Sequence, residues 1–237
     1  MSFQSLHYPD DGVAVPPSAL RQLLPVDVVV SEILDISREF PLHPQERHCV
    51  ESAAPKRMRE FSAGRHCARS ALREVGIENF PLLIGADRSP CWPPTIVGSI
   101  THAGGYCGVA LGARAKFVGI GIDAEVVTDV GKTLGREYSD SWTQIFTIEE
   151  MEWLNCLPQS ERVGMLAVMF SAKEAFYKCQ YSVTRQVMDF NAATVRPDCQ
   201  CFVIEPRDPP LRNRRQYQGR FALWGEFALA TLVMTAA

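Results

Sequence analysis

Hydrophobic and polar positions along the chain follow two different periods, one typical of strands and one typical of helices. Apolar runs of strand length predict strands over residues 26–34, 98–102, 106–112, 117–127, 201–205, 220–224 and 227–234. Spacing close to 3.6 predicts helices over residues 54–75, 147–155 and 165–180. The Pro-, Asp- and Ser-rich residues 1–25 are expected to run over the surface, and residues 128–141 form a polar stretch.

The order of these elements places strands around one main helix in each half of the chain. Residues 1–115 centre on helix 54–75, and residues 116–237 centre on helix 165–180. This order favours an α+β fold with two similar halves over a doubly wound sheet. No sequence repeat accompanies the pattern, so the duplication is a prediction about architecture alone.

The strand over residues 117–127 carries two carboxylates near its end. Strict alternation places Asp123 and Glu125 on one face together with Gly119 and Gly121, which leaves open space beside the acids. Two oxygen ligands on one open surface suit a hard cation such as Mg²⁺. The alternative is a strand end that meets solvent, and the pattern by itself favours that alternative.

Helix 165–180 adds a second charged group. Glu174 and Lys178 lie four residues apart on one face, beside the aromatic Phe170. Glu174 at the border of the apolar stripe could supply a third metal oxygen. The alternative is an ordinary surface ion pair, which stabilises a helix by about 0.3–0.5 kcal/mol.

Basic side chains concentrate in the first half of the chain. Arg57 and Arg65 lie on helix 54–75, with Arg65 close to the apolar stripe, and Arg88 lies in a Pro-rich loop. The planar guanidinium can donate two hydrogen bonds to a phosphate. Thr101 and His102, which end a strand before an Ala-Gly-Gly turn, could also donate to a phosphate. A solvated basic surface and a structural histidine are the alternatives.

Composition narrows the class of protein without naming a function. The 237 residues are 46% hydrophobic and 22% charged with a net charge of -3, near the averages of soluble domains, which predicts no nucleic-acid or membrane partner. Nothing resembles a leader or a spanning helix. The eight cysteines lack paired spacing, and Cys199 with Cys201 is a weak metal motif, so free thiols in a reducing cytoplasm are expected.

Four motifs in order, KRMREFSAGRHCAR, DRSPCWPPTIVGSITH, GIDAE and FSAKEAFYK, resemble the motif set of the 4′-phosphopantetheinyl transferases. The similarity is greatest to the long, two-half type that serves siderophore, peptide and polyketide synthases. The resemblance implies a pseudo-twofold fold with coenzyme A in the cleft between the halves. It also implies Mg²⁺-dependent transfer of the phosphopantetheine arm to a serine of an apo acyl or peptidyl carrier protein.

The resemblance also implies roles for particular residues. The expected metal ligands are Asp123, Glu125 and Glu174. The expected coenzyme contacts are Arg57, Arg65, Arg88, Thr101, His102, Asp123, Glu174 and Lys178, with Lys173 as a weaker candidate. Glu174, Lys178 and Asp123 are expected to be catalytic, with Glu174 or a water that it activates as the base. Ser89, Thr95 and the segment after Lys178 depart from the family pattern.

Two rival functions use the same residues. A Mg²⁺-dependent nucleotide hydrolase would transfer the phosphoryl group to water. A non-catalytic coenzyme A-binding protein would bind the coenzyme without transferring any group. The carrier is expected to dock near Arg185 or on residues 212–216, although a solvated basic loop is an equal alternative for the latter. A two-half fold with an internal cleft needs no second subunit, so a monomer is expected.

Overall fold

Two antiparallel sheets form the framework of the protein. The computed structural model describes residues 18–134, 140–207, 209 and 215–236. The first sheet has the order β1-β3-β2 and the second has the order β4-β8-β7-β6-β5. The strands of the first are β1 (Val29–Ile33), β2 (Ile96–Ala103) and β3 (Tyr106–Ala113). Those of the second are β4 (Phe117–Val126), β5 (Ala193–Asp198), β6 (Cys201–Pro206), β7 (Tyr217–Trp224) and β8 (Phe227–Thr235).

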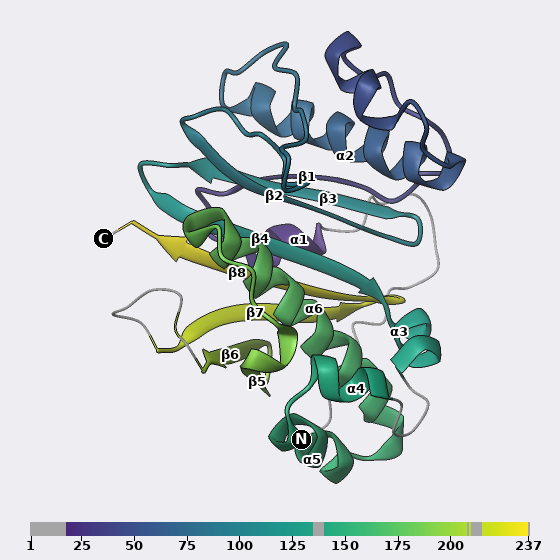
Figure 1. Ribbon diagram of the computed structural model, residues 1–237, viewed down its shortest axis with the longest axis vertical. Helices are drawn as coiled ribbons and strands as arrows, with labels where there is room; N and C mark the ends of the chain where they lie inside the picture. The colour runs from purple at the N-terminus through teal and green to yellow at the C-terminus, as the bar shows by residue number, and fades with distance from the viewer. Residues whose placement is uncertain (1–17, 135–139, 208, 210–214, 237) are drawn as a thin grey trace.

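Each sheet is covered by one long helix, which confirms the predicted α+β class (Figure 1). Helix α2 (Pro55–Glu74) begins at a proline in its first turn, buries Phe61, Ala68 and Leu72, and follows the short 3-10 helix η1 (Pro44–Val50). Helix α6 (Gln159–Thr184) covers the second sheet. Smaller helices flank it: α3 (Val127–Leu134), α4 (Asp140–Ile145), α5 (Ile148–Cys156) and η2 (Phe190–Ala192).

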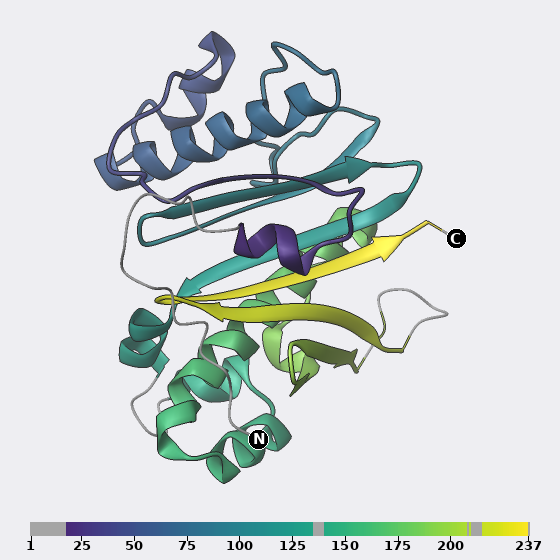
Figure 2. The same cartoon turned by 180° about the vertical axis from the view of Figure 1, so that it is seen from behind.

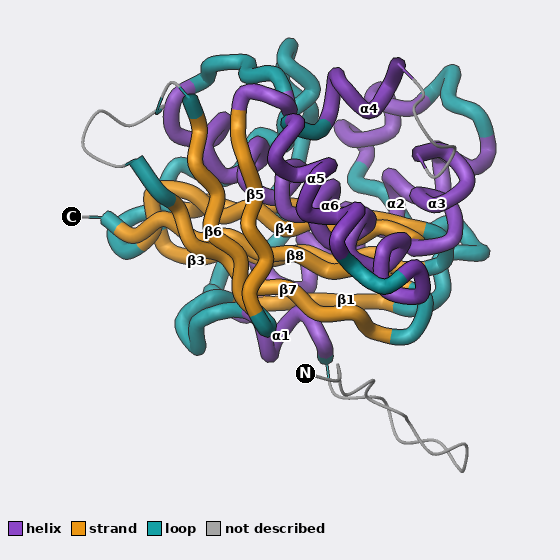
Figure 3. Tube along the Cα trace, turned by 90° about the horizontal axis from the view of Figure 1, so that it is seen from below, coloured by secondary structure: helices purple, strands orange, loops and turns teal. Residues whose placement is uncertain are grey.

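The N-terminal helix α1 (Ala19–Leu23) corrects one prediction. Residues 1–25 were expected on the surface, yet Leu20 and Leu23 are buried against the sheet face opposite α6 (Figures 2 and 3). Arg220 donates to the carbonyl of Gln22 at 3.0 Å, and Thr231 donates to that of Leu23 at 3.1 Å. Five residues are too few for a helical period to stand out. Residues 1–17 lie outside the described residues.

Other elements match or depart from the pattern for local reasons. The Ala-Gly-Gly turn forms a hairpin between β2 and β3 with Gly104 at φ 55°, and a second hairpin joins β7 to β8 with Gly225 at φ 57°; a residue with a side chain would be strained at either position. The polar stretch 128–141 instead contributes the helices α3 and α4, and β5 was not predicted. Strand β5 contains Arg196, Pro197 and Asp198, so its sequence lacks an apolar run.

The two sheets meet where β2 runs beside β4, and side chains join them. The amide of Ile122 donates to Ser99 Oγ at 3.2 Å, and the amide of Ala124 donates to Thr101 Oγ1 at 2.9 Å. Both hydroxyls are buried. These hydrogen bonds satisfy two amide donors on the edge of β4 that forms no backbone hydrogen bonds with a neighbouring strand. They also fix the register of β2 against β4, and this contact between the two sheets is the seam.

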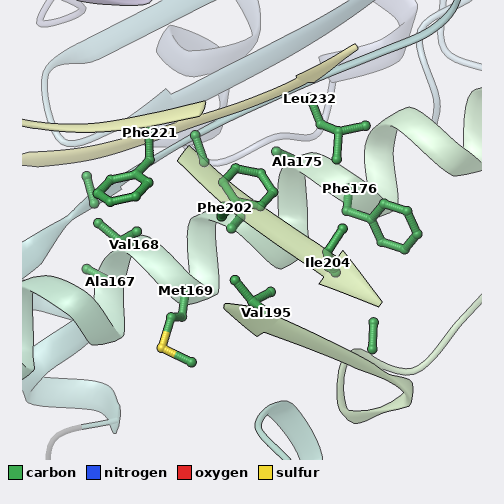
Figure 4. Packing of buried hydrophobic residues seen from close by; sticks show 14 of the residues in the cluster. Ala167, Val168, Met169, Ala175, Phe176, Val195, Phe202, Ile204, Phe221 and Leu232 are labelled. Atoms are coloured by element: carbon green, nitrogen blue, oxygen red, sulfur yellow. The ribbon is translucent and has the colours of Figure 1, made fainter. Parts of the chain in front are cut away.

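Helix α6 lies unusually close to β4. A Cβ built on Gly121 would come within 1.8 Å of the carbonyl oxygen of Ala175, and one on Gly119 within 2.7 Å of that of Cys179. The predicted face with Gly119 and Gly121 therefore receives the helix backbone. Helix α6 also packs on β5–β8 through a cluster that includes Phe176 and Phe202 (Figure 4).

All eight cysteines are free thiols, as predicted. Within the described ranges, no helix combines the length and the hydropathy that crossing a bilayer requires.

Candidate active site

A cleft of about 810 Å³ opens where the two sheets meet. Its walls are α2, the loop at residues 84–92, strand β2 and the C-terminal part of α6, so both halves of the chain contribute. The charged lining residues are Arg57, Glu60, Arg65, Asp87, Arg88, Arg114, Lys178 and Arg185. Cations outnumber anions in this set, which favours an anionic ligand with several charges.

Arg65 lies at the floor of the cleft and is 6% exposed. Its Nε donates to the carbonyl of Leu82 at 2.9 Å, and the guanidinium lies 4.0 Å from the ring centroid of Phe61. Burial lowers the pKa of Arg65 to about 10, while the carboxylate of Glu46 opposes that shift. The guanidinium therefore stays charged at neutral pH with its remaining donors available to a phosphate.

His102 faces the same cleft from the end of β2. Arg57 Nη1 lies 3.3 Å from His102 Nε2, and Glu60 Oε2 lies 3.9 Å from Nδ1. Because arginine can only donate, Nε2 is the acceptor and the proton belongs on Nδ1. Burial lowers the pKa of His102, and Arg57 and Lys178 lower it further against the effect of Glu60.

Asp123 and Lys178 form the ion pair nearest to the seam. Lys178 Nζ donates to Asp123 Oδ1 at 2.6 Å and to the carbonyl of Ile122 at 3.2 Å, and Thr101 Oγ1 donates to the same Oδ1 at 3.3 Å. Asp123 Oδ2 is buried and has no hydrogen-bond partner among the described residues. A buried carboxylate oxygen without a partner is costly, which marks a place for a further cationic group.

Glu125 and Glu174 add negative charge beside this pair. Burial raises the pKa of Glu125 to about 8, with a further contribution from Asp123. Burial also raises the pKa of Glu174, although Lys178 opposes this shift. The pKa of Lys178 is raised because the three carboxylates outweigh the effect of its burial. Three acids that repel one another fit a hard divalent cation in chemistry and charge.

The geometry of these acids is not that of a closed metal cage. Across the described residues, no group of three or more His, Cys, Asp or Glu side chains is close enough to hold an ion as it stands. The donor set fits Mg²⁺, but Lys178 occupies the Oδ1 position on Asp123. A cation here requires rotation of the acidic side chains.

Family models match both halves of the chain. The 4′-phosphopantetheinyl transferase N-terminal domain matches residues 45–112, and the 4′-phosphopantetheinyl transferase superfamily matches residues 119–231. A 4′-phosphopantetheinyl transferase, Npt of Nocardia iowensis, is 34% identical over 176 residues, covering 74% of this chain and 75% of Npt. The chain belongs to the 4′-phosphopantetheinyl transferase superfamily. The predicted resemblance is thereby confirmed.

Further relatives of this transferase carry related names. Svp of Streptomyces mobaraensis, a 4′-phosphopantetheinyl transferase, is 35% identical over 202 residues, which make up 83% of this chain and 79% of Svp. Enterobactin synthase component D of Escherichia coli K12 is 37% identical and covers 54% of this chain and 57% of its own. A solved holo-(acyl-carrier-protein) synthase of Bacillus anthracis is 23% identical, with a TM-score of 0.37, and covers 52% of this chain and 100% of its own.

The site residues that the sequence predicts for this transferase separate into two groups. Arg57, Arg65, Arg88, His102 and Lys178 line the cleft. Thr101, Asp123, Glu125 and Glu174 are not among the described residues that line it. The three carboxylates act on the charge of the Lys178 ammonium, which binds Asp123 directly, and Thr101 donates to Asp123. Lys178 therefore belongs to both groups, because it lines the cleft and its ammonium also binds the Asp123 carboxylate.

Two other predicted contributors are Lys173 and the docking residues 212–216. Lys173 is 2% exposed and pairs with the buried Glu150 at 2.9 Å, on a different side of α6 from Lys178. It also donates to the carbonyl of Phe190 at 2.8 Å, so its position is structural and not in the cleft. Of the predicted docking residues 212–216, residues 212–214 lie outside the described residues.

Several lining residues of this transferase were not predicted. Arg114 follows β3 and reaches the cleft, while its Nε donates to the carbonyl of Pro94 at 3.0 Å. Tyr177 and Tyr181 stack on each other with ring centroids 5.7 Å apart. The i, i+3 spacing of Tyr181 from Lys178 was a usable signal. The contact of Asp87 with Arg185, 98 residues away, had no local signal.

Proposed function

We propose that this transferase moves the phosphopantetheine arm of coenzyme A onto a serine of an apo carrier protein and releases adenosine 3′,5′-bisphosphate. Family membership supports the reaction. The observation that carries its location is the cleft, which has arginines along its walls and Lys178 beside three carboxylates. A coenzyme with phosphates at one end and a pyrophosphate in the middle needs cations at both places.

The nucleotide end is assigned to the first half of the chain. Arg57, Arg65, Arg88 and His102 would hold the 3′-phosphate and the nucleoside. Arg65 is the anchor among them because Leu82 and Phe61 fix its direction. Thr101, placed earlier among the coenzyme contacts, would act through the Asp123 carboxylate that it touches.

The pyrophosphate end is assigned to the second half. Asp123, Glu125 and Glu174 would hold Mg²⁺, which when bound supplies charge neutralisation at the pyrophosphate. The unpartnered Asp123 Oδ2 and the raised pKa of Glu125 support this assignment. Lys178, which lines the cleft, would place its ammonium against the pyrophosphate oxygens.

Glu174 is our candidate for the general base. The carrier serine oxygen forms a bond to the phosphorus that bears the pantetheine arm, and the bond from that phosphorus to the bridging oxygen breaks. The electron pair leaves with adenosine 3′,5′-bisphosphate, and Glu174 receives the serine proton. Its pKa, raised by burial, favours proton acceptance at neutral pH. Full turnover and unchanged metal affinity in Glu174→Gln would contradict this role.

One experiment separates transfer from the rival functions. The protein is incubated with coenzyme A, Mg²⁺ and an apo carrier protein, and the carrier is weighed by mass spectrometry. A gain of one phosphopantetheine arm is the expected result. Release of nucleotide without a gain would indicate hydrolysis, and coenzyme binding without either would indicate a non-catalytic protein. Repetition with EDTA tests the metal requirement.

We also propose the division of the chain into halves, the oligomeric state and the cellular compartment. We assign residues 1–115 and 116–237 as the two halves, and a monomer as the working unit, because both walls of the cleft come from one chain. Action in the cytoplasm is proposed from the eight free thiols.

A further inference from the structure

The loop at residues 84–92 is held in shape by its own backbone. The amide of Gly85 donates to the carbonyl of Ser89 at 2.8 Å, and the amide of Arg88 donates to that of Gly85 at 2.9 Å. Arg88 has φ 65°, a conformation that costs a residue with a side chain about 1 kcal/mol. The loop must therefore gain stabilisation from its surroundings to keep Arg88 in this direction.

Asp87 supplies that stabilisation. One of its carboxylate oxygens binds the loop itself, and the other binds residues of the second half across the cleft. Oδ1 accepts from the amide of Ser89 at 3.0 Å and from its hydroxyl at 2.7 Å, which closes the turn around Arg88. Oδ2 accepts from Tyr181 Oη at 3.1 Å and from Arg185 Nη1 at 3.0 Å, both on the last turns of α6. One side chain thus joins the loop of the first half to the helix of the second.

The partners of Asp87 are themselves held in place. Arg185 caps α6 at φ 57°, and its guanidinium carbon lies 5.7 Å from the ring centroid of Tyr181. Tyr181 in turn stacks on Tyr177, one turn closer to Glu174. The hydrogen bonds from Ser89 lower the pKa of Asp87 to about 2, so the carboxylate remains ionised at neutral pH.

The position of this contact gives it a consequence for the site. Asp87, Arg88, Tyr181 and Arg185 all line the cleft, and Lys178 lines it from the same helix. A connection between the loop and α6 therefore fixes the position of the Arg88 guanidinium relative to the Lys178 ammonium. A ligand with two separated phosphate groups binds best when both cations are already in place.

We propose that Asp87 is a positioning residue which, through Tyr181 and Arg185, holds the loop of Arg88 across the cleft and thereby sets the affinity for coenzyme A. This inference rests on the proposed function, since it names coenzyme A as the ligand. Asp87 touches other side chains in this role and not the reacting atoms. Its effect is expected on binding and not on the chemical step.

The test is isothermal calorimetry of coenzyme A binding to Asp87→Asn, Arg185→Gln and the double variant. Each single variant is expected to raise Kd about three- to tenfold, the range for loss of charge-assisted hydrogen bonds at a partly exposed site. Both single variants remove the Asp87–Arg185 contact, Asp87→Asn also affects the hydrogen bond from Tyr181, and Arg185→Gln also removes a donor 3.3 Å from Ser89 Oγ. The double variant should therefore be weaker by less than the sum of the two single effects. In the transfer assay KM should rise with kcat unchanged.

Glu205→Gln is the matched control. Glu205 is a partly exposed carboxylate on β6 that accepts from Arg196 Nη1 at 2.6 Å, and it is not among the described residues lining the cleft. Its removal should leave Kd unchanged. Melting temperatures of all variants are recorded, since a contact that serves stability alone would lower the melting temperature of Asp87→Asn without raising Kd.

Three outcomes overturn the inference. Unchanged Kd in Asp87→Asn removes the positioning role, and fully additive effects in the double variant show that Arg185 acts independently of Asp87, which overturns the joint role of the two residues. An unmodified protein that does not bind coenzyme A removes the inference together with the proposed function. A protein that binds coenzyme A but leaves the carrier unmodified contradicts the proposed function alone, and the Kd comparison still decides the role of Asp87.

Discussion

Lys178 neutralises a carboxylate that has little access to solvent. Asp123 is 4% exposed, and Lys178 and Thr101 share one of its oxygens. Removal of one partner from a buried pair leaves the other charge uncompensated. A bound cation would compete with Lys178 for Asp123, so the ammonium and a metal would be alternative counterions of the same carboxylate.

This competition gives a prediction for Lys178→Met. In EDTA the variant is expected to lose about 2–4 kcal/mol of unfolding free energy, because Asp123 is left buried without its counterion. Added Mg²⁺ should raise its melting temperature by more than that of the unmodified protein. Lys132→Met, which removes an exposed ion pair with Asp129 at 3.2 Å, is the control and should change little. An equal response to Mg²⁺ in both proteins would contradict the competition.

His102 is expected to make stability depend on pH. Its pKa in the folded protein is lowered by burial and by two cations, so the unfolded chain takes up a proton first as the pH falls. The unmodified protein should therefore lose stability as the pH drops from about 6.5 through the lowered pKa. His102→Gln should lack this part of the loss. Urea denaturation measures the unfolding free energy of both proteins at pH 7 and pH 5. An equal loss in the two proteins would refute the prediction.

At the scale of elements, the packing of α6 on β4 decides where the acids and Lys178 meet. Gly119 and Gly121 let the helix backbone touch the strand, so a side chain on the helix reaches Asp123 directly. The alternation along β4 put the acids and the glycines on one face. It could not tell that a helix, and not the coenzyme, fills the space above the glycines.

Gly121→Ala tests this packing. The new Cβ would lie 1.8 Å from the carbonyl oxygen of Ala175, so α6 must move, and we expect a loss of about 3 kcal/mol or more in unfolding free energy. Gly164→Ala on the same helix is the control, since its Cβ meets only the flexible Leu223 side chain at 3.3 Å. Similar stability of the two variants would show that the approach of α6 is not limiting.

The sequence predicted the elements with a long, clear period and missed those without one. Helix α2 and strand β4 have regular apolar spacing, whereas α1 is five residues long and β5 contains Pro197. The helical period also separates Lys173 from Lys178 by about 140°, so only one of them can face Asp123. The contact of Asp87 with Tyr181 depends on how the two halves pack on each other. The local pattern of apolar and polar residues contains no information about which residues of the two halves come together.

At the scale of the whole molecule, the cleft exists because two sheets are joined at one seam. Ser99 and Thr101 satisfy amides of β4 in place of a backbone ladder. The seam lies next to Asp123, so its register fixes how the cations of the first half face the carboxylates of the second.

Ser99→Ala is predicted to weaken this seam. The amide of Ile122 would lose its acceptor in a buried place, which costs about 1–3 kcal/mol of unfolding free energy. Ser171→Ala is the matched control, since Ser171 is also buried but its hydroxyl has no hydrogen-bond partner among the described residues. Chemical denaturation of both variants measures the difference. A cost in Ser171→Ala equal to that in Ser99→Ala would contradict the role of the seam.

For helix α1 the order of synthesis and the order of folding differ. Its carbonyls at Gln22 and Leu23 bind Arg220 and Thr231, which a ribosome adds about two hundred residues later. A nascent chain can assemble α2 on the first sheet early, but Leu23 packs in a cluster with Phe227 and Leu229, so its surface is incomplete until β8 has emerged. Helix α1 is therefore among the last of the described elements to dock.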